Sequence, residues 1–157
     1  MKMARSYFLF TFYLILIVAF SHTADGQSSS CSCTLDNTGM TMICMNVQSI
    51  AAYQKCMHDQ LNTQSDSRLR RGGVMTNLTI VHHQLRSASS GLLQFSYGNN
   101  VYQLTDLRYL SITDGTLRYI ENQALSLIDR ALEHLDLSYN ELQQIPTSEK
   151  EQFGNLV

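Results

Sequence analysis

The chain has 157 residues, a formal net charge of −2, four cysteines, one proline and no tryptophan. Without an N-terminal export signal about 130 residues remain, enough for one domain with an apolar core. Since that part carries nine basic and twelve acidic residues, the charge excludes nucleic acid and anionic lipid as expected partners.

Residues 1–26 have the features of a secretory signal peptide. Lys2 and Arg5 form a positive start, and the stretch 7–20 is almost wholly apolar but too short for an ordinary membrane span. Small residues follow, so that cleavage after Gly26 or after Ser21 fits. We therefore expect a chain that is secreted or held on the outer face of the plasma membrane. A retained signal anchor is the alternative.

Residues 27–73 are expected to form a cysteine-rich N-terminal cap followed by a loop. An even number of cysteines in an exported chain indicates disulfides, and all four lie here: Cys31, Cys33, Cys44 and Cys56. Cys31 and Cys33 are too close to pair comfortably, so two pairings remain open: Cys31–Cys44 with Cys33–Cys56, or Cys31–Cys56 with Cys33–Cys44. A zinc site of Cys33, Cys44, Cys56 and His58 is a rival that lacks the C-x-x-C spacing.

Within this cap, Met40, Met42 and Val47 favour a short hairpin, with Ile43 and Ile50 continuing its buried side. The polar stretch 58–73 is expected to be a loop that joins the cap to the rest. Its R-x-x-R run, residues 68–71, resembles a proprotein-convertase site, and a solvated basic loop is the plainer interpretation.

Residues 74–157 repeat one spacing of apolar residues. It is clearest in 132–146, LEHLDLSYNELQQIP, where Leu135 and Leu137 alternate with polar residues as on a half-buried strand. The same offsets occur 25 residues earlier, from Leu107, and 32 residues earlier still, from Met75, with a Ser/Gly/Asn-rich insertion at 87–100. This is the leucine-rich-repeat spacing L-x-x-L-x-L-x-x-N-x-L. Asn140 is expected to satisfy backbone groups that the turn leaves unpaired.

The run CSCTLDNTGMTMIC from Cys31 to Cys44, followed by these repeats, resembles animal extracellular leucine-rich-repeat proteins with an N-terminal cysteine cap. The resemblance implies an α/β leucine-rich-repeat solenoid with a short parallel concave sheet and a disulfide-stapled cap. It also implies that Cys31 pairs with Cys44 and Cys33 with Cys56. The chain departs from the family because the usual first cysteine of the cap is missing.

The run 153–156, FGNL, looks like the approach to a further repeat. Because about three repeats are the minimum for a stable stack, we expect a fragment of a longer protein. Attachment to a membrane would then need a missing C-terminal segment. A naturally short secreted form is the alternative.

Outward-facing strand positions are the candidate contacts for a partner. Parallel strands in register would set Tyr109 beside His134 and Arg108 beside Glu133, and tyrosine and arginine are enriched at interface hot spots. The alternative is a solvated sheet with one ion pair of little energetic weight. The candidates are Arg108, Tyr109, Asp114, His134, Asp136 and Tyr139.

The expected function is a protein-binding module of a cell-surface receptor or adhesion protein, with the ligand on the concave sheet. A secreted structural matrix protein is the first alternative and a small secreted hydrolase the second. Asn77 belongs to the sequence's one N-x-[ST] sequon and is expected to carry a glycan.

The sequence contains no recognisable catalytic or phosphate-binding motif. There is no G-x-S-x-G elbow and no phosphate loop, and the adjacent His82 and His83 point in different directions on a strand. We therefore expect no enzyme, no catalytic residue, no cofactor and no metal.

Overall fold

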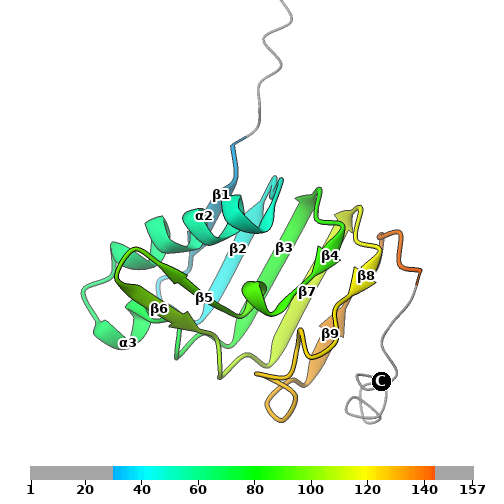
Figure 1. The fold of residues 1–157 in the computed structure, drawn as a ribbon. Coiled ribbons are helices and arrows are strands. Elements are labelled where there is room, and N and C mark those ends of the chain that lie inside the picture. The colour runs from blue at the N-terminus through cyan, green and yellow to red at the C-terminus, as the bar shows by residue number, and fades with distance from the viewer. Residues whose placement is uncertain (1–29, 144–157) are drawn as a thin grey trace, which may run out of the picture. The chain divides into compact units, whose positions relative to one another are not determined.

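The computed structural model of the chain describes residues 30–143. These residues are organised around a five-stranded sheet (Figure 1). The predicted signal peptide and the run 153–156 lie outside these residues. In chain order the elements are β1 (Ser32–Leu35), β2 (Thr41–Met45), α2 (Ile50–Asn62), α3 (Ser67–Arg70), β3 (Asn77–His83), β4 (Ser87–Ala88), the 3₁₀ helix η1 (Ser90–Leu92), β5 (Gln94–Tyr97), β6 (Asn100–Gln103), β7 (Tyr109–Gly115), β8 (Tyr119–Ile120) and β9 (His134–Asp136). Among these helices none is long and apolar enough to cross a membrane.

The strand order in the large sheet is β1-β2-β3-β7-β9. β1 and β2 form an antiparallel hairpin, and every later neighbour is parallel. The register sets Met42, Leu78, Leu110 and Leu135 side by side in one row. The first three of these side chains are at most 1% exposed, because alternate residues of a strand share one face. This inward face is the floor of the core.

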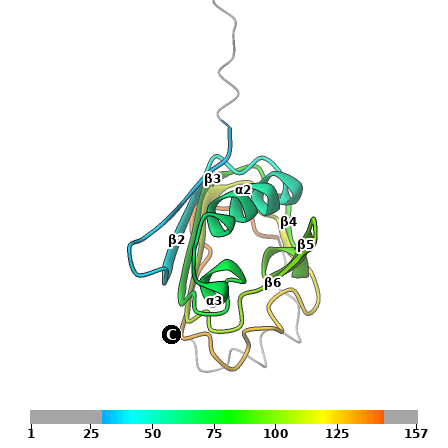
Figure 2. The ribbon, with the colours of Figure 1, turned by 90° about the vertical axis from the view of Figure 1, so that its left-hand side faces the viewer.

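The remaining elements cover that inward face and leave the other face open (Figure 2). Helix α2 lies across the sheet beside the two small sheets, β4–β8 and the antiparallel hairpin β5–β6. The Tyr53 ring of α2 contacts Phe95 of β5 edge-on, with 6.2 Å between ring centroids. Its hydroxyl donates a hydrogen bond of 2.9 Å to the Leu92 carbonyl. The core therefore lies between the sheet and this second layer.

Helix α2 replaces part of the loop predicted for residues 58–73, and α3 replaces another part. The hydroxyl of Ser49 caps α2 by accepting the Ala52 N–H at 3.1 Å. Tyr53, Met57 and Leu61 recur every four residues, so they form one buried stripe. The prediction was wrong because the polar residues between them hide this spacing.

The predicted leucine-rich-repeat solenoid is contradicted by this architecture. The sheet is mixed, since β1 runs antiparallel to β2, and the connections between the parallel strands are unlike one another. Helices α2 and α3 join β2 to β3, a 3₁₀ helix and a hairpin lie between β3 and β7, and turns with β8 lead to β9. The leucine spacing correctly places strands, but the residues between them do not repeat. The result is a mixed α/β fold.

The cysteines also differ from the pairing that the resemblance implies. Cys33 and Cys44 face each other across the β1–β2 hairpin and form a disulfide. Cys44 is therefore not bonded to Cys31. The alternative that the sequence left open, with Cys33–Cys44 as one of its bridges, agrees with the hairpin register. The other two cysteines, Cys31 and Cys56, are free thiols in the structure.

Asn140 holds the turn that follows β9. Its Nδ2 lies 2.6 Å from the Ile112 carbonyl and 3.0 Å from the Leu137 carbonyl, and its Oδ1 accepts the Leu117 N–H at 3.3 Å. The side chain thus satisfies backbone groups of both its own turn and the neighbouring strand β7, as the sequence predicted.

Whereas the adjacent His82 is exposed, His83 is only 3% exposed at the end of β3. Its ring lies over Gly115, its register partner on β7, where any Cβ would overlap the ring. The Nδ1 accepts the Leu85 N–H at 3.2 Å, while Nε2 has no hydrogen-bond partner among the described residues. Because Nδ1 accepts, Nε2 carries the hydrogen of the neutral ring.

We expect Gly115→Ala to lower the free energy of unfolding by about 1–3 kcal/mol, because the new methyl group displaces the His83 ring. In a His83→Ala background the same change should cost much less, which denaturant titration of the four variants would show. Gly73→Ala is the matched control, since nothing lies within 4 Å of the Cβ position there. Equal costs in both backgrounds would contradict the contact.

Burial lowers the pKa of His83, while Asn140 and Asp114 oppose this to a smaller extent. The unfolded chain then binds the proton more readily, so the free energy of unfolding should fall as the pH drops below about 6.5. Hydrogen bonds lower the pKa values of Asp36 and Asp136, so these two carboxyl groups change the free energy of unfolding only near and below pH 3.8. His83→Asn should therefore flatten the stability profile between pH 6.5 and about 5; an unchanged slope in urea titrations would contradict this assignment.

Candidate binding surface

The outward face of the sheet presents side chains for contact. We call it the sheet surface, and define it by the outward residues of β2, β3, β7 and β9: Thr41, Ile43, Met45, Asn77, Thr79, Val81, Tyr109, Ser111, His134 and Asp136. Among the described elements no helix or strand lies over it (Figure 2).

One half of the sheet surface is apolar. Ile43 and Met45 of β2 are each 41% exposed, and Met45 lies beside Val81 of β3 in the register. Sequence reasoning missed this half and expected Ile43 on the buried side. In β2 both faces are apolar, since Met42 and Cys44 point inward, and hydrophobicity alone does not tell the faces apart.

The other half combines aromatic and charged side chains. Tyr109 and His134 are register partners whose ring centroids lie 5.9 Å apart. Just before these strands, Arg108 and Glu133 form an ion pair of 3.1 Å in which both side chains are more than half exposed. The predicted neighbours are thus brought together at the amino ends of β7 and β9. An exposed pair of this kind contributes little to stability. The Arg108 guanidinium can therefore leave Glu133 at little cost and bind a partner.

The remaining candidates lie nearer the carboxyl ends of the strands. Asp114 and Tyr139 have positive φ angles of 54° and 56°, and the Gly115 N–H donates to the Tyr139 carbonyl at 3.0 Å. Tyr139 is 81% exposed. Asp136 accepts hydrogen bonds from the Ser138 hydroxyl and N–H, and these lower its pKa. Asp136 therefore has a structural role in the turn.

Asn77 of the sequon lies on the sheet surface, half-buried between Thr41 of β2 and Tyr109 of β7. A glycan on this side chain would stand beside Tyr109 and shield the amino end of the sheet surface. A partner that contacts Tyr109 would therefore have to accommodate a glycan on Asn77.

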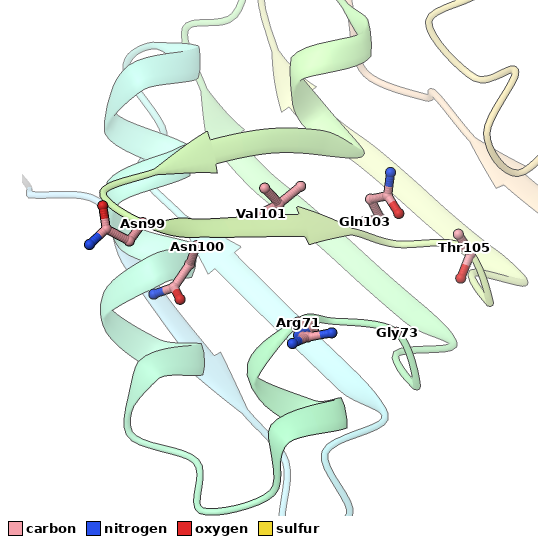
Figure 3. Close-up of a pocket in the computed structure, with 7 residues that line it drawn as sticks. All are labelled: Arg71, Gly73, Asn99, Asn100, Val101, Gln103 and Thr105. Carbon is pink, nitrogen blue, oxygen red and sulfur yellow. The ribbon is translucent and has the colours of Figure 1, made fainter.

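A pocket of about 510 Å³ lies away from the sheet surface, beside β6 (Figure 3). Its two walls are joined by a hydrogen bond of 3.2 Å from the Gln103 N–H to the Arg71 carbonyl. Apart from the half-buried Gly73 the lining is exposed, and Arg71 carries its only charge. The lining residues are Arg71, Gly73, Asn99, Asn100, Val101, Gln103 and Thr105.

Within the described range, one group of side chains has the spacing to hold a metal ion: the sulfurs of Cys31, Cys33 and Cys56. Because Cys33 is bonded to Cys44, only two free thiols remain in this group, and the rival zinc set does not assemble. His58 instead places Nδ1 2.5 Å from the Tyr102 hydroxyl and stacks on Tyr97. His82 is exposed whereas His83 is buried, so the two do not form a site.

Comparisons with models of protein families, with curated proteins and with solved structures find no match to this chain.

Asn77 should be glycosylated when the chain is made in a secretory cell, because its side chain is partly accessible in an exported sequence. Treatment with peptide-N-glycosidase should then increase the mobility of the wild-type chain on a gel. Asn77→Gln should show the faster mobility without treatment. No shift for wild-type material that has been secreted would contradict the assignment.

Proposed function

We propose that this chain is an extracellular protein-binding module that contacts its partner through the sheet surface. The observation that carries the proposal is the open outward face of the sheet, on which large side chains are exposed although none is needed for the core. Ile43, Met45 and Tyr109 are between 41% and 46% exposed there. Exposed apolar and aromatic side chains that gather on one face are typical of contact surfaces.

The arrangement of this surface supports recognition of a protein in preference to a small molecule. It runs across four hydrogen-bonded strands. None of the strand residues that define it lines either of the pockets of about 510 and 320 Å³, although Arg108 and Glu133, which lie just before the strands, line the smaller pocket. The apolar half of the sheet surface adjoins a half with Tyr109, His134 and, just before the strand, Arg108, and aromatic residues, methionine and arginine are enriched at protein interfaces.

The location outside the cell is part of the same proposal. The N-terminal 26 residues read as a signal peptide, and the Cys33–Cys44 disulfide belongs to chemistry that persists in oxidising compartments. In such a setting the module would act by presenting a rigid surface, as receptors and adhesion proteins do, with no reaction of its own.

Substitutions on the two halves of the sheet surface test the proposal. The wild-type chain is first screened against a panel of cell-surface ectodomains, and its partner is then titrated with the variants. Ile43→Asp and Tyr109→Ala should each weaken binding by tenfold or more, the size expected for interface hot spots. Secretion should remain normal, because both side chains lie outside the core.

Val101→Asp is the matched control. Val101 is an apolar residue that is 54% exposed on β6, in the layer that covers the inward face. It should leave the affinity unchanged. If Val101→Asp weakened binding as strongly as Ile43→Asp, or if neither sheet variant had an effect, the sheet surface would not be the contact.

A further inference from the structure

Two free thiols lie against the Cys33–Cys44 disulfide. Cys31 and Cys56 are both half-buried and unbonded, and the sulfurs of Cys31, Cys33 and Cys56 all lie within 4.8 Å of one another. The two thiols come from different elements, since Cys31 directly precedes β1 and Cys56 belongs to α2.

The local structure explains why these sulfurs meet. Cys31 and Cys33 are two residues apart in extended chain, so their side chains point to the same side, which is the side toward α2. Cys56 lies next to Met57 on that helix, and the Met57 sulfur contacts the Cys44 sulfur at 3.8 Å. Helix α2 packs on β1 and β2, which holds Cys56 at the thiol of Cys31.

We propose that Cys31 and Cys56 are joined by a second disulfide, which ties the segment before β1 to helix α2. This completes the second of the two pairings that the sequence left open, and it does not depend on the proposed function. The first bridge closes the β1–β2 hairpin at the edge of the sheet. The second would connect that edge to the layer that covers the core.

The oxidant is a low-molecular-weight disulfide such as oxidised glutathione, which exchanges with protein thiols through a mixed disulfide. Burial, helped by the neighbouring Cys56, raises the pKa of Cys31 to about 12, so Cys31 is protonated at neutral pH and attacks poorly. In the exchange the Cys56 sulfur gives up its proton to solvent and attacks the oxidised glutathione, giving Cys56–S–S–glutathione and one glutathione thiolate. That thiolate takes the Cys31 proton as Cys31 attacks the Cys56 sulfur and expels the second glutathione. Two protein thiols are oxidised and one glutathione disulfide is reduced.

The test counts and maps free thiols in the full chain after equilibration with oxidised and reduced glutathione. Alkylation with N-ethylmaleimide under denaturing conditions, without reductant, should add no label to the wild-type chain. Two labels, on Cys31 and Cys56, would overturn the proposal. So would a bound zinc ion in a native mass spectrum.

Cys31→Ser identifies the partner of each cysteine. Trypsin cuts between Lys55 and Cys56, so Cys56 lies in a peptide separate from Cys33 and Cys44. The variant should carry one label, in the peptide that begins at Cys56. A label on Cys44 instead would support the Cys31–Cys44 pairing and overturn ours. Cys56→Ser is the matched variant and should move the single label to Cys31.

Thermal unfolding gives a second readout that needs only the wild-type chain and the double variant Cys31→Ser/Cys56→Ser. Closing the loop between residues 31 and 56 should raise the unfolding midpoint of the oxidised wild-type chain by roughly 10 °C over the double variant. Equal midpoints, together with full labelling of the wild-type thiols, would also contradict the bridge.

Discussion

The register of the inward-facing side chains is the constraint on which the rest of the structure depends. Met42, Leu78, Leu110 and Leu135 stand side by side across four parallel strands. A slip of one residue in any strand would turn its apolar side chains to the open face and its outward ones to the core. Each fully buried leucine or isoleucine on this floor contributes about 1.5–3 kcal/mol, so the register is strongly defined.

A second inward row explains the position of the disulfide and the shape of the cover. In register it joins Cys33 and Cys44 to Ile80 and Ile112, so the bridge occupies a place that larger apolar residues take on the later strands. Helix α2 lies over this region and contributes the buried Tyr53 and Met57. Because the core lies on one side of the sheet only, the outward side chains do not pack in a core. The sheet surface is therefore accessible to a partner.

Much of the sheet could be predicted from the sequence, whereas the layer above it could not. The leucine spacing located β3, β7 and β9 and the register that sets Tyr109 beside His134, because strand alternation is a local pattern. The spacing gave no information on the connections, whose residues do not repeat, and so the solenoid prediction was wrong.

The buried stripe of α2 was present in the sequence at Tyr53, Met57 and Leu61 but was obscured by polar neighbours. The burial of His83 depends on Gly115 in another strand, and the hairpin register decides between cysteine pairings that sequence spacing leaves equal.

Hydroxyl-radical footprinting of methionines in the native chain tests the central claim, that β2 turns one face to the core and the other to solvent. Met42 and Met45 are three residues apart, and their side chains are 0% and 41% exposed. The account predicts rapid oxidation of Met45, with Met40 of the hairpin turn (49% exposed) as an internal reference, and strong protection of Met42. Oxidation of Met42 at the rate of Met45 would contradict the register and, with it, the separation of the core from the sheet surface.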